Sequence, residues 1–359
     1  MNKRVHQFLA FIALVLLTAV TAASQTVPNS LSSLPEADTL VYINPQRILN
    51  DALPKVMPEK QVADMREHFT QMKQQAGIDP TKIDYIVIAN RFKKPTADLN
   101  FQPGEFMIVI GGDFSAESLI TLARMGTGGK LRDEAYGGKT LSLMTIDEIA
   151  KMAEQNPMLK SFSQVGIVAL NANTIAAGSP DYLRAAVDAG AGNGRISAEA
   201  LNSLLRDPSA LVSIAGSPWK AFAKSFGLLG TETTPRAARC ESKMGDFYGA
   251  LTMDATNFKL RGAMNADNPD TAKIINNLIS GLVQQAMGAI KDPSAQALMK
   301  GFSITPQDDE IVLQADFPQQ MVADLVRQHM MPQKQPTTMT TPPKPGIKVR
   351  VKRRARRKP

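Results

Sequence analysis

The residues best suited to binding chemistry lie at the end of this sequence, where Lys344 to Pro359 hold nine basic residues and no acid. Such a stretch attracts polyanions by charge and does not distinguish among them. It contains no aromatic residue on which a nucleic acid base would stack, which makes nucleic acid an unfavoured partner. The predicted polyanion-binding residues are Lys344, Lys348, Arg350, Lys352, Arg353, Arg354, Arg356, Arg357 and Lys358.

Residue patterns for catalysis or metal binding are weak in the rest of the chain. Asp64 and His68 are four residues apart, a spacing more typical of a surface pair on a helix than of a metal site. Cys240 lies between Arg239 and Lys243, whose charges favour a thiolate, but no histidine accompanies it. We predict no cofactor and no catalytic site, and the reactivity of Cys240 stays open. An enzyme whose site is assembled from distant carboxylates remains an alternative.

The first 23 residues have the physical character of an export signal. Lys3 and Arg4 precede an uncharged apolar run, Phe8–Val20, and small residues follow at Thr21–Ser24. Thirteen apolar residues are fewer than the ~20 that a membrane-spanning helix needs, and small side chains suit a signal peptidase. We therefore expect a signal peptide at 1–23 and a mature protein that is periplasmic or extracellular.

Positive charge is concentrated at the two ends of the chain. The sequence holds 41 basic and 33 acidic residues. Setting aside Lys3, Arg4 and the nine basic residues of the tail leaves 30 basic residues against 33 acids, a net charge of about −3. Near an anionic membrane each cation contributes about 1 kcal/mol, so the tail suits salt-sensitive adhesion. We predict an exported, non-enzymatic binding or structural protein of the cell envelope, held by its tail to lipid headgroups, lipopolysaccharide or wall polymer.

The body shows a repeated pattern of two strand-like runs followed by a helix. Ser115 and Pro180 give two of the helices a capping residue and a favourable first residue, respectively. The pattern predicts an α+β fold of repeated ββα or split βαβ (ferredoxin-like) units, with antiparallel sheets and helices mainly on one face. The four repeats are expected at 83–125, 165–190, 246–290 and 302–330.

The domain organisation follows from this pattern and from a change in composition near the end. We expect one α+β domain at 30–205 and a second at 206–331. A Pro/Thr-rich segment then opens the tail, and 332–359 is predicted to be a disordered linker with the basic residues at its end.

Methionine is abundant, with 18 residues against one Trp and five Tyr. Most of these side chains are expected to fill the core, but methionine also forms adaptable binding surfaces. The alternative function is therefore a carrier or sensor of a hydrophobic ligand held between the sheet and Met-rich helices. Its cavity would be lined by Met65, Met72, Leu278 and Met287.

The segment Leu34–Asn44 (LPEADTLVYIN) follows the predicted signal peptide closely. It resembles the entry to the first strand in uncharacterised bacterial exported proteins that have a repetitive α+β body. The resemblance implies export and architecture, and it brings no reaction, ligand or site residue. The oligomeric state, the pathway and the identity of the partner stay open.

Overall fold

The computed structural model describes residues 31–77, 79–91, 104–145, 163–217, 244–289, 296 and 301–330. The expected signal peptide, Cys240 and the basic tail lie outside the described residues.

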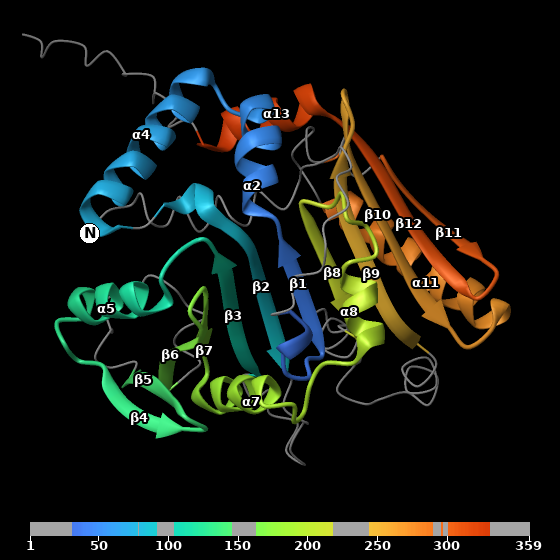
Figure 1. Cartoon of the computed structure of the whole chain (residues 1–359). Helices are drawn as coiled ribbons and strands as arrows, with labels where there is room; N and C mark the ends of the chain where they lie inside the picture. Colours follow the sequence, from blue (N-terminus) through green and yellow to red (C-terminus); the bar gives the residue numbers. More distant parts are fainter. Residues whose placement is uncertain are drawn as a thin grey trace, which may run out of the picture.

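The described strands form one antiparallel sheet of twelve, with the order β11-β12-β10-β9-β8-β1-β2-β3-β7-β6-β5-β4 (Figure 1). The first six strands in chain order are β1 (Thr39–Ile43), β2 (Ile83–Arg91), β3 (Glu105–Gly112), β4 (Arg132–Tyr136), β5 (Lys139–Thr145) and β6 (Gln164–Asn171). The other six are β7 (Thr174–Gly178), β8 (Val212–Gly216), β9 (Met244–Met253), β10 (Asn257–Ala266), β11 (Phe302–Gln307) and β12 (Glu310–Pro318).

Helical segments connect these strands and cover the sheet. The longer ones are α4 (Glu59–Ala76), α5 (Ala116–Gly126), α7 (Pro180–Gly190), α8 (Ala198–Leu204), α11 (Pro269–Ala289) and α13 (Gln319–Met330). Short turns of helix are η2 (Leu31–Ser33), α2 (Pro45–Arg47), η3 (Ile48–Ala52), α3 (Leu53–Val56) and η4 (Pro80–Lys82).

The mixed α+β class is as predicted, and the four ββα units are present as β2-β3-α5, β6-β7-α7, β9-β10-α11 and β11-β12-α13. The split βαβ arrangement is not confirmed. A split unit separates its two parallel strands by a third, whereas β1 and β2 are direct antiparallel neighbours in this sheet.

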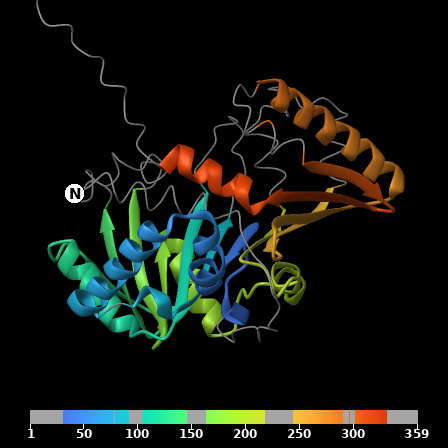
Figure 2. The same ribbon diagram turned by 90° about the horizontal axis from the view of Figure 1, so that it is seen from above.

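Helices pack on both faces of the sheet, which differs from the expected one-sided arrangement. The reason is visible in β1, where both Tyr42 on one face and Ile43 on the other are buried. A strand that is apolar on both faces needs cover on both. α7 and α8 pack over the face that carries Tyr42, whereas α3 and α13 pack over the face that carries Ile43. Figure 2 shows α11 and α13 along the same side of the sheet.

One sheet runs through both expected domains. The expected boundary between 205 and 206 falls after α8, and β8 then pairs directly with β1 through Ile214 and Val41. The division into two domains remains a prediction about folding units.

Candidate functional site

A continuous row of apolar residues crosses the middle of the sheet at right angles to the strands. Each member stands directly opposite the next in the strand register. We call this set the isoleucine row, and its members in spatial order are Ile214, Val41, Ile88, Ile108, Ala177 and Ile167. Neighbouring strands are about 4.8 Å apart, so six strands give the row a length of about 24 Å.

The isoleucine row is only partly buried along its whole length. The adjacent row on the opposite face uses the same six strands, and its members are at most 4 % exposed. Those buried members are Ser213, Tyr42, Val87, Val109, Ala176 and Val168. One face of the central sheet is therefore sealed by α7, α8 and η2, while the other keeps an apolar strip in partial contact with solvent.

The surroundings of the isoleucine row are built from three elements. Val41 and Ile88 pack against the buried cluster that includes Leu53 of α3 and Val322 of α13. On the other side, α5 lies against β6. Ile108, in the middle, belongs to none of the three buried clusters found among the described residues.

The row has a polar group at its β5 end. Ser142 stands opposite Ile167 and is buried. Its Oγ donates a hydrogen bond to Asp133 Oδ1 at 2.8 Å. Arg124 of α5 donates to the same carboxylate at 2.8 Å and to Ser142 Oγ at 3.2 Å. The hydrogen bond from Arg124 is the main reason why the pKa of Asp133 lies below its ordinary value, followed by that from Ser142.

At its other end the row runs into glycine. Gly249 of β9 stands opposite Ile214, and a Cβ placed there would come within 3.0 Å of Ile214 Cγ2. The row is thus apolar at the β9 end and has the Arg124–Asp133 ion pair with the Ser142 hydroxyl at the β5 end. This arrangement matches an elongated molecule with an apolar chain and a polar head.

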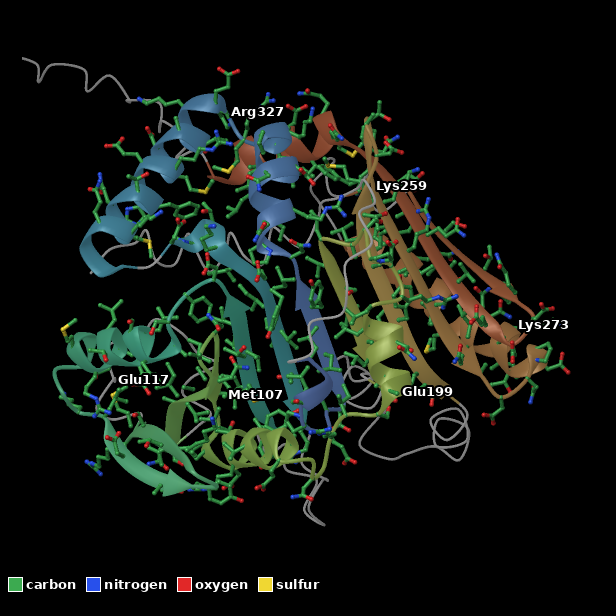
Figure 3. All side chains as sticks on the ribbon, in the orientation of Figure 1. Met107, Glu117, Glu199, Lys259, Lys273 and Arg327 are labelled. Carbon is green, nitrogen blue, oxygen red and sulfur yellow. The ribbon has the colours of Figure 1, made fainter. Side chains whose placement is uncertain are left out.

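Many charged side chains of the described body form ion pairs with one another. Figure 3 labels three basic side chains, on β10, α11 and α13, each of which pairs with an acid nearby. These pairs are Lys259–Asp254, Lys273–Asp270 and Arg327–Asp324. Further pairs are Arg47–Asp51, Lys73–Asp79, Lys82–Asp113, Arg91–Glu105, Arg124–Asp133, Arg184–Glu134, Arg184–Asp181 and Arg261–Asp316.

The residues singled out in the sequence are not brought together by the described structure. The nine basic residues of 344–358 lie outside it. Met65 and Met72 are partly buried on α4, with Met65 against the cluster that adjoins the isoleucine row. Leu278 and Met287 belong to α11, but their side chains are outside the described set. The expected cavity lined by these four residues therefore remains a prediction.

Asp64 and His68 are both exposed on α4. Within the described ranges, no three His, Cys, Asp or Glu side chains are grouped so as to hold a metal ion. Among the helices described, none has the length and apolar character required to span a bilayer.

Comparisons with known proteins give structural likeness alone. No family model matches the chain, and no curated protein matches it. The fold is similar to that of TP0453 in crystal form III, with a TM-score of 0.44 and 10 % identity, covering 85 % of this chain and 100 % of that one. TP0453 in crystal form I gives a TM-score of 0.41 at 10 % identity, covering 85 % of this chain and 99 % of that one.

Sequence reasoning missed the isoleucine row, although a signal for it exists. In β2 and β3 apolar residues occupy both phases of the alternation, as in Tyr85-Ile86-Val87-Ile88 and Met107-Ile108-Val109-Ile110. Such runs indicate a strand with two apolar faces. They do not reveal which of the two faces the helices leave partly open.

Proposed function

We propose that the protein is an exported binding protein of the cell envelope that holds an elongated apolar ligand against the isoleucine row. The observation that carries this proposal is the contrast between the two faces of the central strands. The row beside Val109 is sealed, while the row through Ile108 is partly exposed over six strands. A continuous row of half-buried apolar side chains offers a surface on which an apolar ligand can pack.

The ligand class follows from the chemistry along the row. Branched aliphatic side chains offer no hydrogen bonds, so the main part of the ligand is a hydrocarbon chain. Arg124, Asp133 and Ser142 at the β5 end suit a polar head group that exchanges hydrogen bonds with them. A single-chain amphiphile such as a fatty acid or a lysolipid combines the two.

Titration of the purified protein with a fluorescent fatty acid tests this proposal. The double variant Ile88→Thr/Ile108→Thr keeps two β-branched residues in the strands but removes apolar surface at the centre of the row. We expect it to bind about tenfold more weakly or worse, because each buried aliphatic group contributes more than 1 kcal/mol. Ile274→Thr is the matched control, since Ile274 is 52 % exposed on α11, a helix that packs on β10, β11 and β12.

If the unmodified protein binds no fatty acid, or if the double variant and Ile274→Thr bind equally well, the row is not a ligand site. Thermal unfolding of both variants shows that any loss of binding is not a loss of folding.

The basic tail supplies the second part of the proposal, an electrostatic tether to an anionic surface of the envelope. The nine basic residues of 344–358 have no acid among them. We expect the full chain to sediment with anionic vesicles at low salt and to be released by high salt. Deleting Lys344–Pro359 should abolish sedimentation, and equal retention of both forms would exclude the tether.

A further inference from the structure

We propose that Ile347–Lys352 of the tail adds to the free edge of β11 as a further strand of the sheet. The proposal goes beyond the binding of apolar or anionic ligands, because it concerns an attachment of the chain to itself. Its basis is the main chain of β11, the sequence of the tail and the position at which α13 leaves the sheet.

β11 is the last strand at one end of the sheet and pairs, among the described residues, with β12 alone. A two-residue turn, Asp308-Asp309, joins the two strands, with Asp308 in the left-handed region at φ 51°. Gln307 and Glu310 close that turn. In such a hairpin the closing residues form the hydrogen-bonded pair, and the alternate residues turn their main-chain groups away from the partner strand.

The outward-turned residues of β11 are therefore Phe302, Ile304 and Pro306. Pro306 fits this assignment, since a residue without an N–H costs no ladder hydrogen bond when it faces outward. Phe302 and Ile304 present an N–H and a C=O each, and Pro306 presents its C=O. β11 carries no charged side chain of the kind that commonly protects an edge.

The tail contains a segment with the alternation of a half-buried strand. In Ile-Lys-Val-Arg-Val-Lys (347–352) the apolar residues occupy every second position. Placed beside β11, one face of this segment extends the apolar face that carries Phe302 and Ile304. The other face carries Lys348, Arg350 and Lys352 on the side of the sheet where Gln314 and Asp316 of β12 are exposed.

The length of the chain permits this addition. α13 has 12 residues, so its end is about 18 Å from its start. α13 begins directly after Pro318 of β12. Pro318 is three residues beyond Ala315, the partner of Phe302, so the start of α13 is about 10 Å along β12 from Ala315. The sixteen residues 331–346 reach about 50 Å in an extended form. That reach exceeds the sum of the two distances.

The direction of approach agrees with the charges. The tail reaches β11 at its Phe302 end and runs toward Gln307, parallel to β11. Arg353–Lys358 then arrive at the turn, where Asp308, Asp309 and Glu310 follow one another. In this arrangement the cations of Arg353–Lys358 lie near the acids of the turn while Ile347, Val349 and Val351 extend the apolar face. The preferred orientation is parallel for this reason.

Hydrogen–deuterium exchange on the full chain tests the addition at the amides of Phe302 and Ile304. We expect exchange there to be slower by about tenfold or more than in a variant lacking 344–359. Val349→Pro breaks the pairing while keeping all nine cations, and should expose both amides as the deletion does. Ala355→Pro lies beyond the proposed strand and should leave them protected.

Equal exchange at these two amides in all four forms would overturn the proposal. Protection that appears only at high protein concentration would also overturn it, because the strand would then come from a second copy. Val349→Pro should bind anionic vesicles at least as tightly as the unmodified chain, because its cations are no longer held beside Asp308, Asp309 and Glu310. Absence of vesicle binding in both forms would reject the tether without bearing on the strand.

Discussion

A Cβ atom on Gly178 would overlap the carbonyl oxygen of Phe106 and lie 2.8 Å from Met107 Cα. Gly178 stands between β3 and β6, opposite Met107 on one side and Gly166 on the other. The close approach of two backbones at this point needs a residue without a side chain.

Gly178→Ala should therefore lower the free energy of unfolding by at least about 2 kcal/mol, because backbone has to move to admit the methyl group. Gly190→Ala is the matched control. A Cβ on Gly190 meets nothing within 4 Å at the end of α7, so this change should be neutral or stabilising by up to about 1 kcal/mol. Urea unfolding measures both, and similar losses for the two variants would contradict the packing argument.

The carboxylate of Asp133 accepts the hydrogen bond of a buried hydroxyl, that of Ser142. Asp133→Ala should cost about 1–2 kcal/mol, since it leaves that buried hydroxyl without its acceptor. Ser142→Ala removes the hydroxyl itself and should cost less. The ion pair with Arg124 contributes little to the difference, because both side chains are more than a third exposed. Chemical denaturation measures the unfolding free energy of both variants. A loss for Ser142→Ala that equals or exceeds the loss for Asp133→Ala would refute this account.

Asp133 also makes the stability of the fold depend on pH in the acid range. The pKa of Asp133 is lower in the folded protein than its ordinary value, mainly because Arg124 donates to it. Its contribution to stability is therefore complete above pH ~4 and is lost as the pH falls through the folded pKa. The stability difference between the unmodified protein and Asp133→Ala should shrink between pH 5 and about pH 2. A difference that stays constant over this range would show that the carboxylate charge plays no part.

Tyr42 makes the stability of the fold depend on pH in the alkaline range. Burial raises the pKa of Tyr42 from 10.0 to about 12, with the charge of Asp84 as a smaller cause. The folded state thus resists ionisation, so stability is complete below pH 10 and is lost as the pH rises toward 12. Tyr42→Phe should make the unfolding free energy fall less steeply over this interval. Thermal melts at pH 8 and about pH 11 measure the slope, and parallel curves would contradict the prediction.

Local structure was well predicted from the sequence because its signals are local. Ser115 caps α5 as expected, since its Oγ accepts from the amide of Ser118 at 3.3 Å. Pro180 occupies the first turn of α7. The hairpins follow from short polar turns such as Asn171-Ala172-Asn173, between β6 and β7.

The strand order was not predictable in the same way. Nothing near Val41 in the sequence indicates that it stands opposite Ile214. The pairing of β1 with β8 depends on which apolar surfaces remain uncovered once the hairpins have formed. The candidate site shares this difficulty, because the isoleucine row is assembled from strands scattered along the chain and is defined by what the helices leave open.

The pairing of β1 with β8 has a consequence for biogenesis. Thr39 has a strand neighbour on both sides only when Gly216 is present, so more than half of the chain must be available before the centre of the sheet closes. Contacts of such high sequence separation slow folding to milliseconds or longer. A nascent polypeptide of this sequence thus keeps one side of β1 unpaired until more than half of the chain has been synthesised, which leaves time for a chaperone to engage it.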